Sequence, residues 1–427
     1  MVRLPCPCLI QFPSEKTLQE AATAAVIAKE TGLPIPRQHF YDDASPVGPY
    51  VMMDYVETQG SVSARLTVPG KDSSVPHVLD PDIAESTLEA IWGQIAQCYL
   101  QLHQLKFPRI GSLVEISPGI YDVAGIPITH NMNDMVRLAI VPRPVLPPEG
   151  TTYTTADGWY TALAEMHIAQ LVFQHNDAVV SEDDCRNKYV SRQIFRRLAI
   201  QGRLSTFGFS DDCWSAQSSK IPAATLSPAP SGSNNFRLWG DDFRAGNILL
   251  TSADKIAALV DWEFTYAGPT QFSLDPPWWL LLETVGMWSS GMDDWCEVYQ
   301  KRLGTWLAAM RRAEAETDEP SSLPASLSMY MEQSWATGRF FLSYAARESL
   351  AFDAVYWKYL DERFFGDRGS GGSGRDLWRT RLRLLTDEER AAMEPFVARK
   401  MAEAGERRLV DWDPVDAKDS ISQLLFD

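Results

Sequence analysis

Two apolar runs separated by a short polar segment most constrain how this chain can fold. The runs are Ile248–Leu250 and Ile256–Val260, and Thr251–Lys255 between them has the composition of a tight turn. A hairpin built from these runs brings its two open ends together. Asn247 precedes the first run and Asp261 follows the second, so we expect these two polar side chains to lie close together.

The segment before the hairpin contains a carboxylate close in sequence to Asn247. Asp242 lies five positions before Asn247, in the string Gly240-Asp-Asp-Phe-Arg-Ala-Gly-Asn247. A carboxylate on a loop can orient or deprotonate a hydroxyl group, and Asp and Asn oxygens suit the hard ion Mg²⁺. Phosphoryl transfer needs this combination. The sequence therefore predicts Asp242 as the catalytic base and Asn247 and Asp261 as metal ligands; Asp241 is the alternative base.

Composition limits the classes of partner. The chain has 427 residues with 45% hydrophobic content, which suits two lobes with sizeable cores. Its 39 basic and 56 acidic residues leave a formal charge of −17, which opposes nucleic acid and anionic membrane as partners. This charge does not exclude ATP, because a few local cations and a divalent metal can hold phosphates within an acidic protein.

Cysteine usage and hydropathy indicate a cytosolic protein. The six cysteines are scattered, which favours free thiols in a reducing compartment. No signal peptide is visible. The longest apolar run, from Pro276 to Met287, is too short to span a bilayer and is interrupted by Glu283.

Local patterns predict a small mixed segment followed by a large helical body. Strands are expected at the start of the chain, at Pro49–Glu57 and just before the polar string, at 236–238; residues 58–80 are expected as loop. Helices are expected at 14–31, 83–105, 160–174, 185–200, 277–288, 292–316, 324–361 with breaks, and 387–406. Segments 202–235 and 366–374 are rich in small and polar residues, and we expect them to be flexible loops.

The polar string resembles the signature of a known family. In aminoglycoside phosphotransferase-like enzymes, a branch of the protein-kinase-like superfamily, the signature is His-Gly-Asp-Leu-His-x-x-Asn, followed by a strand that ends in Asp-Trp-Glu. This chain has Gly240-Asp-Asp-Phe-Arg-Ala-Gly-Asn247 and then Asp261-Trp-Glu263, and it is most similar to the fungal branch. The resemblance extends to a hinge at Met53–Val56 and covers nearly the whole chain.

The resemblance implies an α+β, bilobal protein-kinase-like fold. Residues 1–57 would form the N-terminal lobe and hinge, and 58–427 a large, mostly helical C-terminal lobe. The family's glycine-rich loop and two strands would precede Arg3, so the N-terminal lobe is expected to be truncated. Arg3 also stands where the family often has Lys, and Trp239-Gly240 replaces the signature His.

The resemblance also implies a set of site residues. It gives Asp242 the position of the base and Asn247 and Asp261 the positions of the metal ligands. Glu20 would pair with the cation that binds the nucleotide, and backbone groups at the hinge would meet adenine. The implied cofactor-binding residues are Arg3, Glu20, Asp54 and Val56.

Simpler interpretations exist for several of these residues. Glu20 could be an exposed helix residue paired with Lys16, and Arg3 an ordinary surface residue near the terminus. Glu263 could support the site from behind or bind the metal itself. His103 lies among apolar helix positions and is expected to be a packing residue.

The expected function is an ATP- and Mg²⁺-dependent phosphotransferase that acts on a hydroxyl group of a small molecule. The alternative is a catalytically impaired pseudokinase or binding protein of the same fold, or an N-terminally truncated gene model. The sequence names neither the acceptor nor the oligomeric state.

Overall fold

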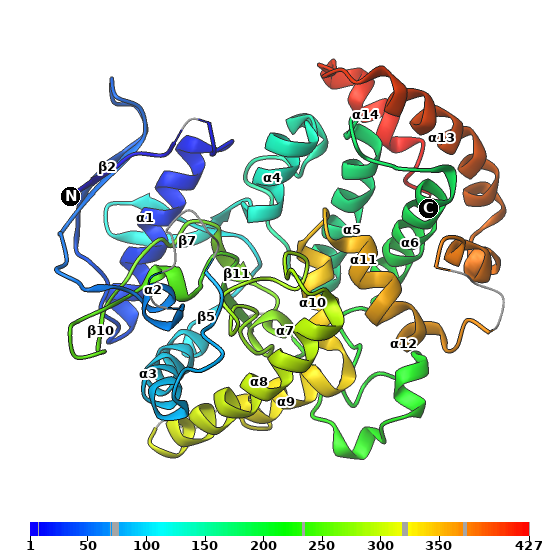
Figure 1. Ribbon diagram of the computed structural model, residues 1–427. Helices are drawn as coiled ribbons and strands as arrows, with labels where there is room; N and C mark the ends of the chain where they lie inside the picture. Colours follow the sequence, from blue (N-terminus) through cyan, green and yellow to red (C-terminus); the bar gives the residue numbers. More distant parts are fainter. Residues whose placement is uncertain are drawn as a thin grey trace. The chain divides into compact units, whose positions relative to one another are not determined.

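The chain folds into two compact units (Figure 1). The computed structural model describes residues 1–6, 8–68, 70, 77–232, 235–317, 323–369 and 374–426. Unit 1 comprises Met1–Pro7, Phe12–Ile128 and Gly232–Ser334, and unit 2 comprises Cys8–Gln11, Thr129–Ser231 and Trp335–Asp427. All strands of the described residues belong to unit 1, whereas unit 2 is helical. The chain therefore combines helices and strands as expected, while the lobe boundary at residue 57 stays a prediction.

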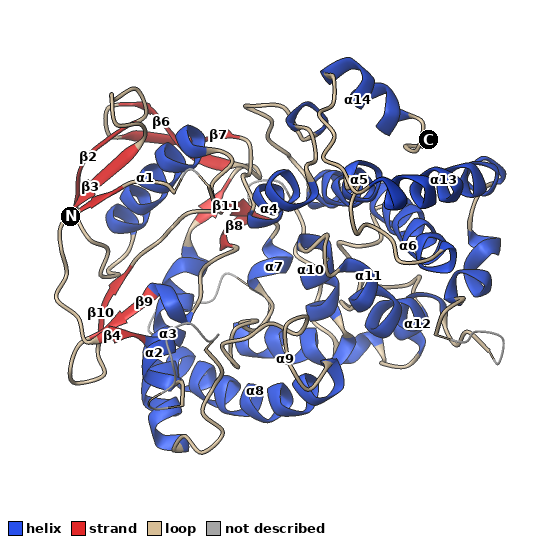
Figure 2. Ribbon diagram, turned by 45° about the horizontal axis from the view of Figure 1, so that its top comes forward, coloured by secondary structure: helices blue, strands red, loops and turns tan. Residues whose placement is uncertain are grey.

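The first sheet of unit 1 lies against a long helix. Its strands are β1 (Val2–Arg3), β2 (Gln38–Asp42) and β3 (Tyr50–Met53), paired antiparallel in the order β1-β3-β2. Figure 2 shows α1 (Pro13–Glu30) beside β2 and β3. Ala21 of the helix packs against Val51 and Met53 of the central strand. The predicted first strand and first helix are confirmed.

The predicted hairpin forms the second sheet. β9 (Ile248–Leu250) pairs antiparallel with β10 (Ile256–Leu259), and β4 (Gly60–Ser61) adds a third strand to the other side of β9. At the open end Ile248 faces Leu259, and the Val260 N–H donates to the Asn247 carbonyl at 3.0 Å. The hairpin therefore aligns the segments that lead to Asn247 and Asp261.

The third sheet supports the polar string. It has the order β11-β8-β5, with β11 (Thr265–Gly268), β8 (Phe236–Gly240) and β5 (Lys106–Phe107). Thr265 pairs with Gly240, so the two strands meet where the polar string begins. A separate hairpin consists of β6 (Ser112–Ser117) and β7 (Ile120–Gly125), which the sequence did not predict.

Five helices complete the described part of unit 1 besides α1. They are α2 (Val62–Leu66), α3 (Glu85–Gln104), α7 (Thr270–Ser273), α8 (Met292–Ala315) and α9 (Leu327–Thr337), most of which belongs to this unit. Figure 1 shows α3 beside α8. Trp92 and Trp306 meet between them edge to face, with ring centroids 6.3 Å apart. The predicted helices at 83–105 and 292–316 are confirmed.

The helix expected at 277–288 is wrong, because this segment consists of turns. Trp279, Leu280 and Leu281 are all buried, and three consecutive buried positions do not fit a helix with one apolar face. The Leu281 carbonyl accepts a hydrogen bond from the Leu79 N–H at 3.1 Å, so backbone groups find partners outside the segment. Tertiary packing thus overrides the local helical pattern.

Unit 2 is a group of helices whose mainly apolar interior also contains buried charged residues. Its described α-helices are α4 (His130–Ala139), α5 (Ala156–Phe173), α6 (Glu182–Ile200), α10 (Arg339–Arg347), α11 (Phe352–Val355), α12 (Asp361–Phe365), α13 (Asp387–Glu406) and α14 (Pro414–Ser422). A π-helical turn at 356–360 joins α11 to α12. Short 3-10 helices lie at 143–145, 216–219, 223–225 and 377–384 in this unit, and at 245–247 in unit 1. Arg381 forms a buried ion pair with Asp361 at 2.9 Å.

The two expected loops contain anchored residues. In segment 202–235, Phe207 and Phe209 are buried, and the Gly208 N–H donates to the buried Asp212 carboxylate at 3.0 Å. Residues 233–234 of that segment and 370–373 of the second lie outside the described residues. In the second segment Arg368 binds Glu362 at 3.1 Å. The expected flexibility of both segments stays a prediction.

The remaining expectations concern membranes and thiols. Among the described residues, none of the helices combines the length and apolar character that a bilayer crossing requires. All six cysteines are free thiols, as predicted. The reducing compartment that they suggested stays a prediction.

Candidate functional site

Asp242 and Asn247 meet in the turn between β8 and β9. The Asn247 side-chain amide donates to the Asp242 carbonyl oxygen at 2.8 Å and to the Oδ2 atom of its carboxylate at 3.1 Å. Arg244 donates to the other carboxylate oxygen at 2.7 Å. Asn247 is buried, whereas the Asp242 side chain keeps 19% exposure. The turn therefore holds one carboxylate in a defined orientation with limited access to solvent.

Asp241, the alternative base, has different partners. The indole N–H of Trp239 donates to its carboxylate at 2.7 Å, and its own backbone N–H donates to the Phe264 carbonyl at 3.1 Å. These bonds join Asp241 to β8 and to the segment before β11. The contact with Asn247 belongs to Asp242.

A second group of charged residues gathers around Arg3. One guanidinium nitrogen of Arg3 lies 2.5 Å from Glu20 of α1, and the other contacts Asp261 and lies 3.2 Å from Glu263. We call Arg3, Lys16, Glu20, Asp261 and Glu263 the charge cluster. The structure thus joins three residues that the sequence singled out: Arg3, Glu20 and Asp261. Glu20 is buried, which contradicts its interpretation as an exposed helix residue.

Lys16 belongs to this cluster, although the sequence suggested for it only a surface pairing with Glu20. It is 4% exposed, contacts Glu263, and lies 4.0 Å from Glu20. Lys16 and Glu20 are four positions apart on α1 and so share one helix face. The four-residue spacing is the one feature of the sequence that indicated a contact between Lys16 and Glu20. It did not reveal that this face of the helix is turned toward the segment after β10.

The charge cluster has more negative than positive groups. Its three carboxylates face two cations, and oxygens of Glu20, Asp261 and Glu263 lie within 4.8 Å of one another. Burial, together with repulsion from Asp261, raises the pKa of Glu20 to about 7, although Arg3 opposes this shift. Burial and Asp261 also raise the pKa of Glu263. When all three carboxylates are ionised, they carry one negative charge more than Arg3 and Lys16 balance, and a further cation would stabilise this ionised form.

The backbone after β10 has an uncommon conformation. Asp261 has a φ of 64° and Phe264 a φ of 56°, in the left-handed region. Asp tolerates this region better than most residues, whereas a bulky Phe rarely occupies it. Trp262 between them stacks on Phe243, with ring centroids 5.3 Å apart and planes at 13°. This stack connects the turn that carries Asp242 to the segment that carries Asp261.

The hinge residues Asp54 and Val56 follow β3 directly. Arg3 pairs with Val51 across the sheet, which places the start of the hinge near β1. The Asp54 N–H donates to the Arg37 carbonyl at 2.9 Å. Within the part of the chain that the structure describes, neither the Asp54 carbonyl nor the Val56 N–H has a backbone partner, so both remain available to a ligand.

The two halves of the site are linked through the hairpin. In the described ranges no hydrogen bond or ion pair joins Asp242 or Asn247 directly to the charge cluster. The link is the bond between the Val260 N–H and the Asn247 carbonyl, beside Asp261. The roles assigned to Asp242, Asn247 and Asp261 therefore stay predictions, although all three lie in unit 1.

The donor atoms of the site fit a hard divalent cation. Carboxylate oxygens of Glu20, Asp261 and Glu263 are the ligand type that Mg²⁺ prefers. Arg3 and Lys16 lie among them and could contact anionic oxygens of a nucleotide. The set therefore fits a metal–nucleotide complex in the chemistry of its donors.

Comparisons with known proteins find matches for this chain among solved structures alone. No family model matches it, and no curated protein matches it. Among solved structures, it is similar to a macrolide 2'-phosphotransferase type I, with 13% identity, coverage of 85% of this chain and 81% of that chain, and a TM-score of 0.36. A candidate aminoglycoside phosphotransferase from Ralstonia eutropha JMP134 has 10% identity, coverage of 95% and 85%, and a TM-score of 0.32. TM-scores this low do not establish a shared fold.

Proposed function

We propose that this protein is an ATP- and Mg²⁺-dependent phosphotransferase of the aminoglycoside phosphotransferase-like type, which transfers phosphate to a hydroxyl group of a small molecule. The observation that carries the proposal is the charge cluster. Arg3, from the first strand, contacts Glu20 of α1 and Asp261 after the hairpin. A strand cation, a helix acid and a strand-end Asp are three parts that kinase-like sites combine around nucleotide phosphates.

In this proposal, one group of residues would bind the nucleotide and the metal, and Asp242 would bind the acceptor. The Asp54 carbonyl and the Val56 N–H would bind the adenine edge. Arg3 would bind phosphate oxygens while Glu20 holds its guanidinium in place, and Asp261 with Asn247 would hold Mg²⁺. The bound metal would neutralise charge on the phosphates.

Asp242 would act on the acceptor. Its carboxylate is fixed by Asn247 and Arg244, which leaves it oriented but still partly exposed. A carboxylate has about four lone-pair sites, so oxygens that already accept hydrogen bonds can accept one more from a substrate hydroxyl. Asp242 would therefore align the hydroxyl and receive its proton during transfer.

Calorimetric titration with ATP and Mg²⁺ tests the nucleotide half of this proposal. Asp261→Asn is the informative variant, because Asn also tolerates the left-handed backbone found at this position. We expect the wild type to bind and the variant to bind more than about tenfold less tightly, a loss of roughly 1.4 kcal/mol. Asp254→Asn is the matched control, since Asp254 lies in the turn of the same hairpin, 3.0 Å from Arg65.

The outcomes distinguish the candidate functions. A wild-type protein that binds no nucleotide at millimolar concentrations refutes the proposal. Nucleotide binding with no transfer of the γ-phosphate to any compound in a broad panel of alcohols and sugars favours the binding-protein alternative. Transfer that depends on Asp242 supports the enzyme.

A further inference from the structure

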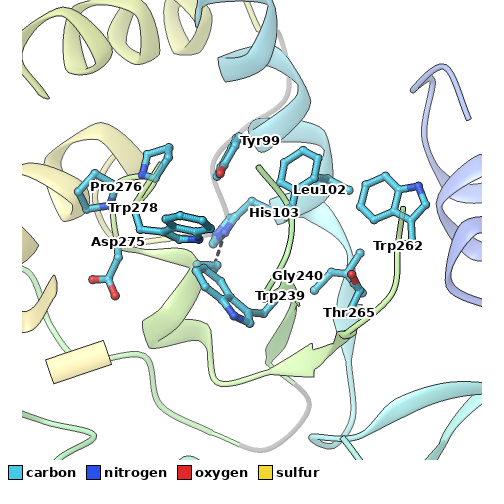
Figure 3. A pocket seen from close by; sticks show the side chains of 14 residues that line it. Tyr99, Leu102, His103, Trp239, Gly240, Trp262, Thr265, Asp275, Pro276 and Trp278 are labelled. Atoms are coloured by element: carbon cyan, nitrogen blue, oxygen red, sulfur yellow. Dashed lines mark hydrogen bonds between the residues drawn. The ribbon is translucent and has the colours of Figure 1, made fainter. Parts of the chain in front are cut away.

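An aromatic pocket, seen from close by in Figure 3, is lined in part by Gly240 and Phe243 of the turn that carries Asp242. Its empty volume is about 590 Å³, including the part that opens to solvent. All of its lining residues belong to unit 1. Most of the wall is aromatic or apolar, and its main members are Tyr99, Leu238, Trp239, Phe243, Pro276 and Trp278.

His103 is one of four polar residues in this wall, with Thr265, Ser273 and Asp275. It comes from the end of α3 and is 9% exposed. Figure 3 shows its imidazole facing the same space as Trp239 and Trp278. Its Nδ1 atom lies 3.2 Å from the Ser273 hydroxyl, whereas its buried Nε2 atom has no hydrogen-bond partner in the described part of the chain. A buried polar atom without a partner is costly unless a ligand or water satisfies it.

The neighbouring serine indicates which nitrogen carries the proton. The Ser273 hydroxyl donates its one hydrogen to the Thr270 carbonyl at 2.8 Å. This carbonyl is closer to the serine oxygen than the Nδ1 atom is, at 2.8 Å against 3.2 Å, which favours the tautomer in which Nδ1 carries the hydrogen and the serine oxygen accepts it. The Nε2 atom is left with a bare lone pair, and it is therefore a hydrogen-bond acceptor that needs a donor.

The imidazole is also neutral under ordinary conditions. Burial, with smaller contributions from the positive charges of Arg237 and Lys106, lowers the pKa of His103 to about 3. A neutral acceptor in a mainly apolar wall favours a neutral donor, because an isolated charge brought into such a site would lose its hydration. Aromatic side chains favour a flat aromatic partner.

We propose that this pocket binds a neutral aromatic alcohol, whose ring packs among Tyr99, Trp239 and Trp278 and whose hydroxyl donates to the Nε2 atom of His103. This site is separate from the proposed phosphotransfer site and does not depend on it. Gly240 and Phe243, which flank Asp241 and Asp242, form part of its wall. A ligand there would contact the residues that hold the catalytic turn, which gives it a regulatory position.

A pair of ligands with the same rings, of which one has a hydroxyl donor and the other its methyl ether, tests the proposal. 2-Naphthol has the hydroxyl, whereas 2-methoxynaphthalene has the same rings without a donor. We expect the wild type to bind 2-naphthol about fivefold to tenfold more tightly, as one net hydrogen bond predicts. In the ¹⁵N NMR spectrum of the labelled full-length protein, the Nε2 resonance of His103 should shift with 2-naphthol and stay in place with the methyl ether.

Two variants complete the experiment. His103→Phe should abolish the preference for the hydroxyl compound, while His130→Phe, at a partly exposed histidine of unit 2, should keep it. Absence of 2-naphthol binding up to its solubility limit overturns the proposal. Equal binding of the two ligands by the wild type, or an unchanged Nε2 resonance, overturns it as well and leaves a hydrated cavity. If the Phe ring of the variant fills the pocket and blocks both ligands, the NMR measurement on the wild type still tests whether the hydroxyl binds the Nε2 atom.

Discussion

Asn247 fixes Asp242 at two points, because its amide donates to the carbonyl at 2.8 Å and to the carboxylate at 3.1 Å. One side chain thereby determines both the backbone and the side-chain orientation of the proposed base. The amide oxygen of Asn247 is not part of these two bonds and stays available as a metal ligand. With the proposed roles of the two residues, this arrangement would couple the position of the acceptor hydroxyl to the position of the metal.

Asp242→Asn should separate catalysis from nucleotide binding. The substitution removes the proton acceptor and keeps the shape of the side chain, so we expect phosphate transfer to fall by about 10²–10⁴-fold. Calorimetry should show that ATP and Mg²⁺ still bind. Transfer assays with labelled ATP measure the first effect. Unchanged transfer by this variant would assign the role of base to another residue, with Asp241→Asn as the next variant.

Arg3→Ala should destabilise unit 1. Removal of the guanidinium leaves Glu20, Asp261 and Glu263 with Lys16 as the remaining cation of the cluster. We expect a loss of about 1–3 kcal/mol in the free energy of unfolding, less than for a fully buried pair because Arg3 is 28% exposed. Urea denaturation measures it.

The control for Arg3 is a surface pair in the same unit. Arg65→Ala breaks the contact with Asp254, in which the two side chains are 46% and 36% exposed. This substitution should cost less than about 1 kcal/mol. Equal effects of the two substitutions would show that the charge cluster contributes no more than an ordinary surface ion pair.

Loss of the buried ion pair between Arg381 and Asp361 should lower the free energy of unfolding of unit 2 strongly. Their side chains are 1% and 0% exposed, and the guanidinium also donates to the Gly366 carbonyl at 2.6 Å. Arg381→Ala leaves a buried carboxylate with Arg368 as its remaining charged partner, so we expect a loss of about 3–5 kcal/mol. Thermal unfolding should show a clear decrease in Tm. Arg379→Ala, at a neighbouring residue that is 57% exposed, is the control and should change Tm little.

The contribution of the two buried histidines to stability should fall as the pH decreases below 6.5, while the raised pKa of Glu20 acts in the opposite direction between about pH 7 and 4.5. Burial lowers the pKa of His103 to about 3, and it also lowers the pKa of His167 well below its ordinary value. Between pH 6.5 and 3 the unfolded chain binds protons that the folded protein excludes. Each histidine then contributes a loss of up to about 1.4 kcal/mol per pH unit, and the contribution is complete above pH 6.5.

Urea denaturation at a series of pH values measures this slope. His103→Phe should reduce the slope, because one of the two histidines no longer takes up a proton on unfolding. Comparison of slopes separates this effect from any change in packing, which shifts stability equally at every pH. An unchanged slope in the variant would mean that His103 accepts a proton in the folded state.

Signals within a few residues of one another determined much of the fold. The hairpin at 248–259 and the helices at 292–315 and 387–406 follow from apolar spacing and turn composition, and the structure has them as predicted. Helix 130–139, hairpin 112–125 and helix 414–422 lie outside the predicted elements, although Asp413 followed by Pro414 is a local signal for the start of a helix.

The sequence by itself determined the hairpin and the polar residues at its open ends, because strand pairing across a short turn is a local event. Only the tertiary structure decided that Arg3 meets Asp261, a residue 258 positions away, and that Lys16 is buried beside Glu263. It also decided that segment 277–288 forms turns around buried Trp279. Such contacts depend on how all intervening elements pack, and local propensity holds no information about that packing.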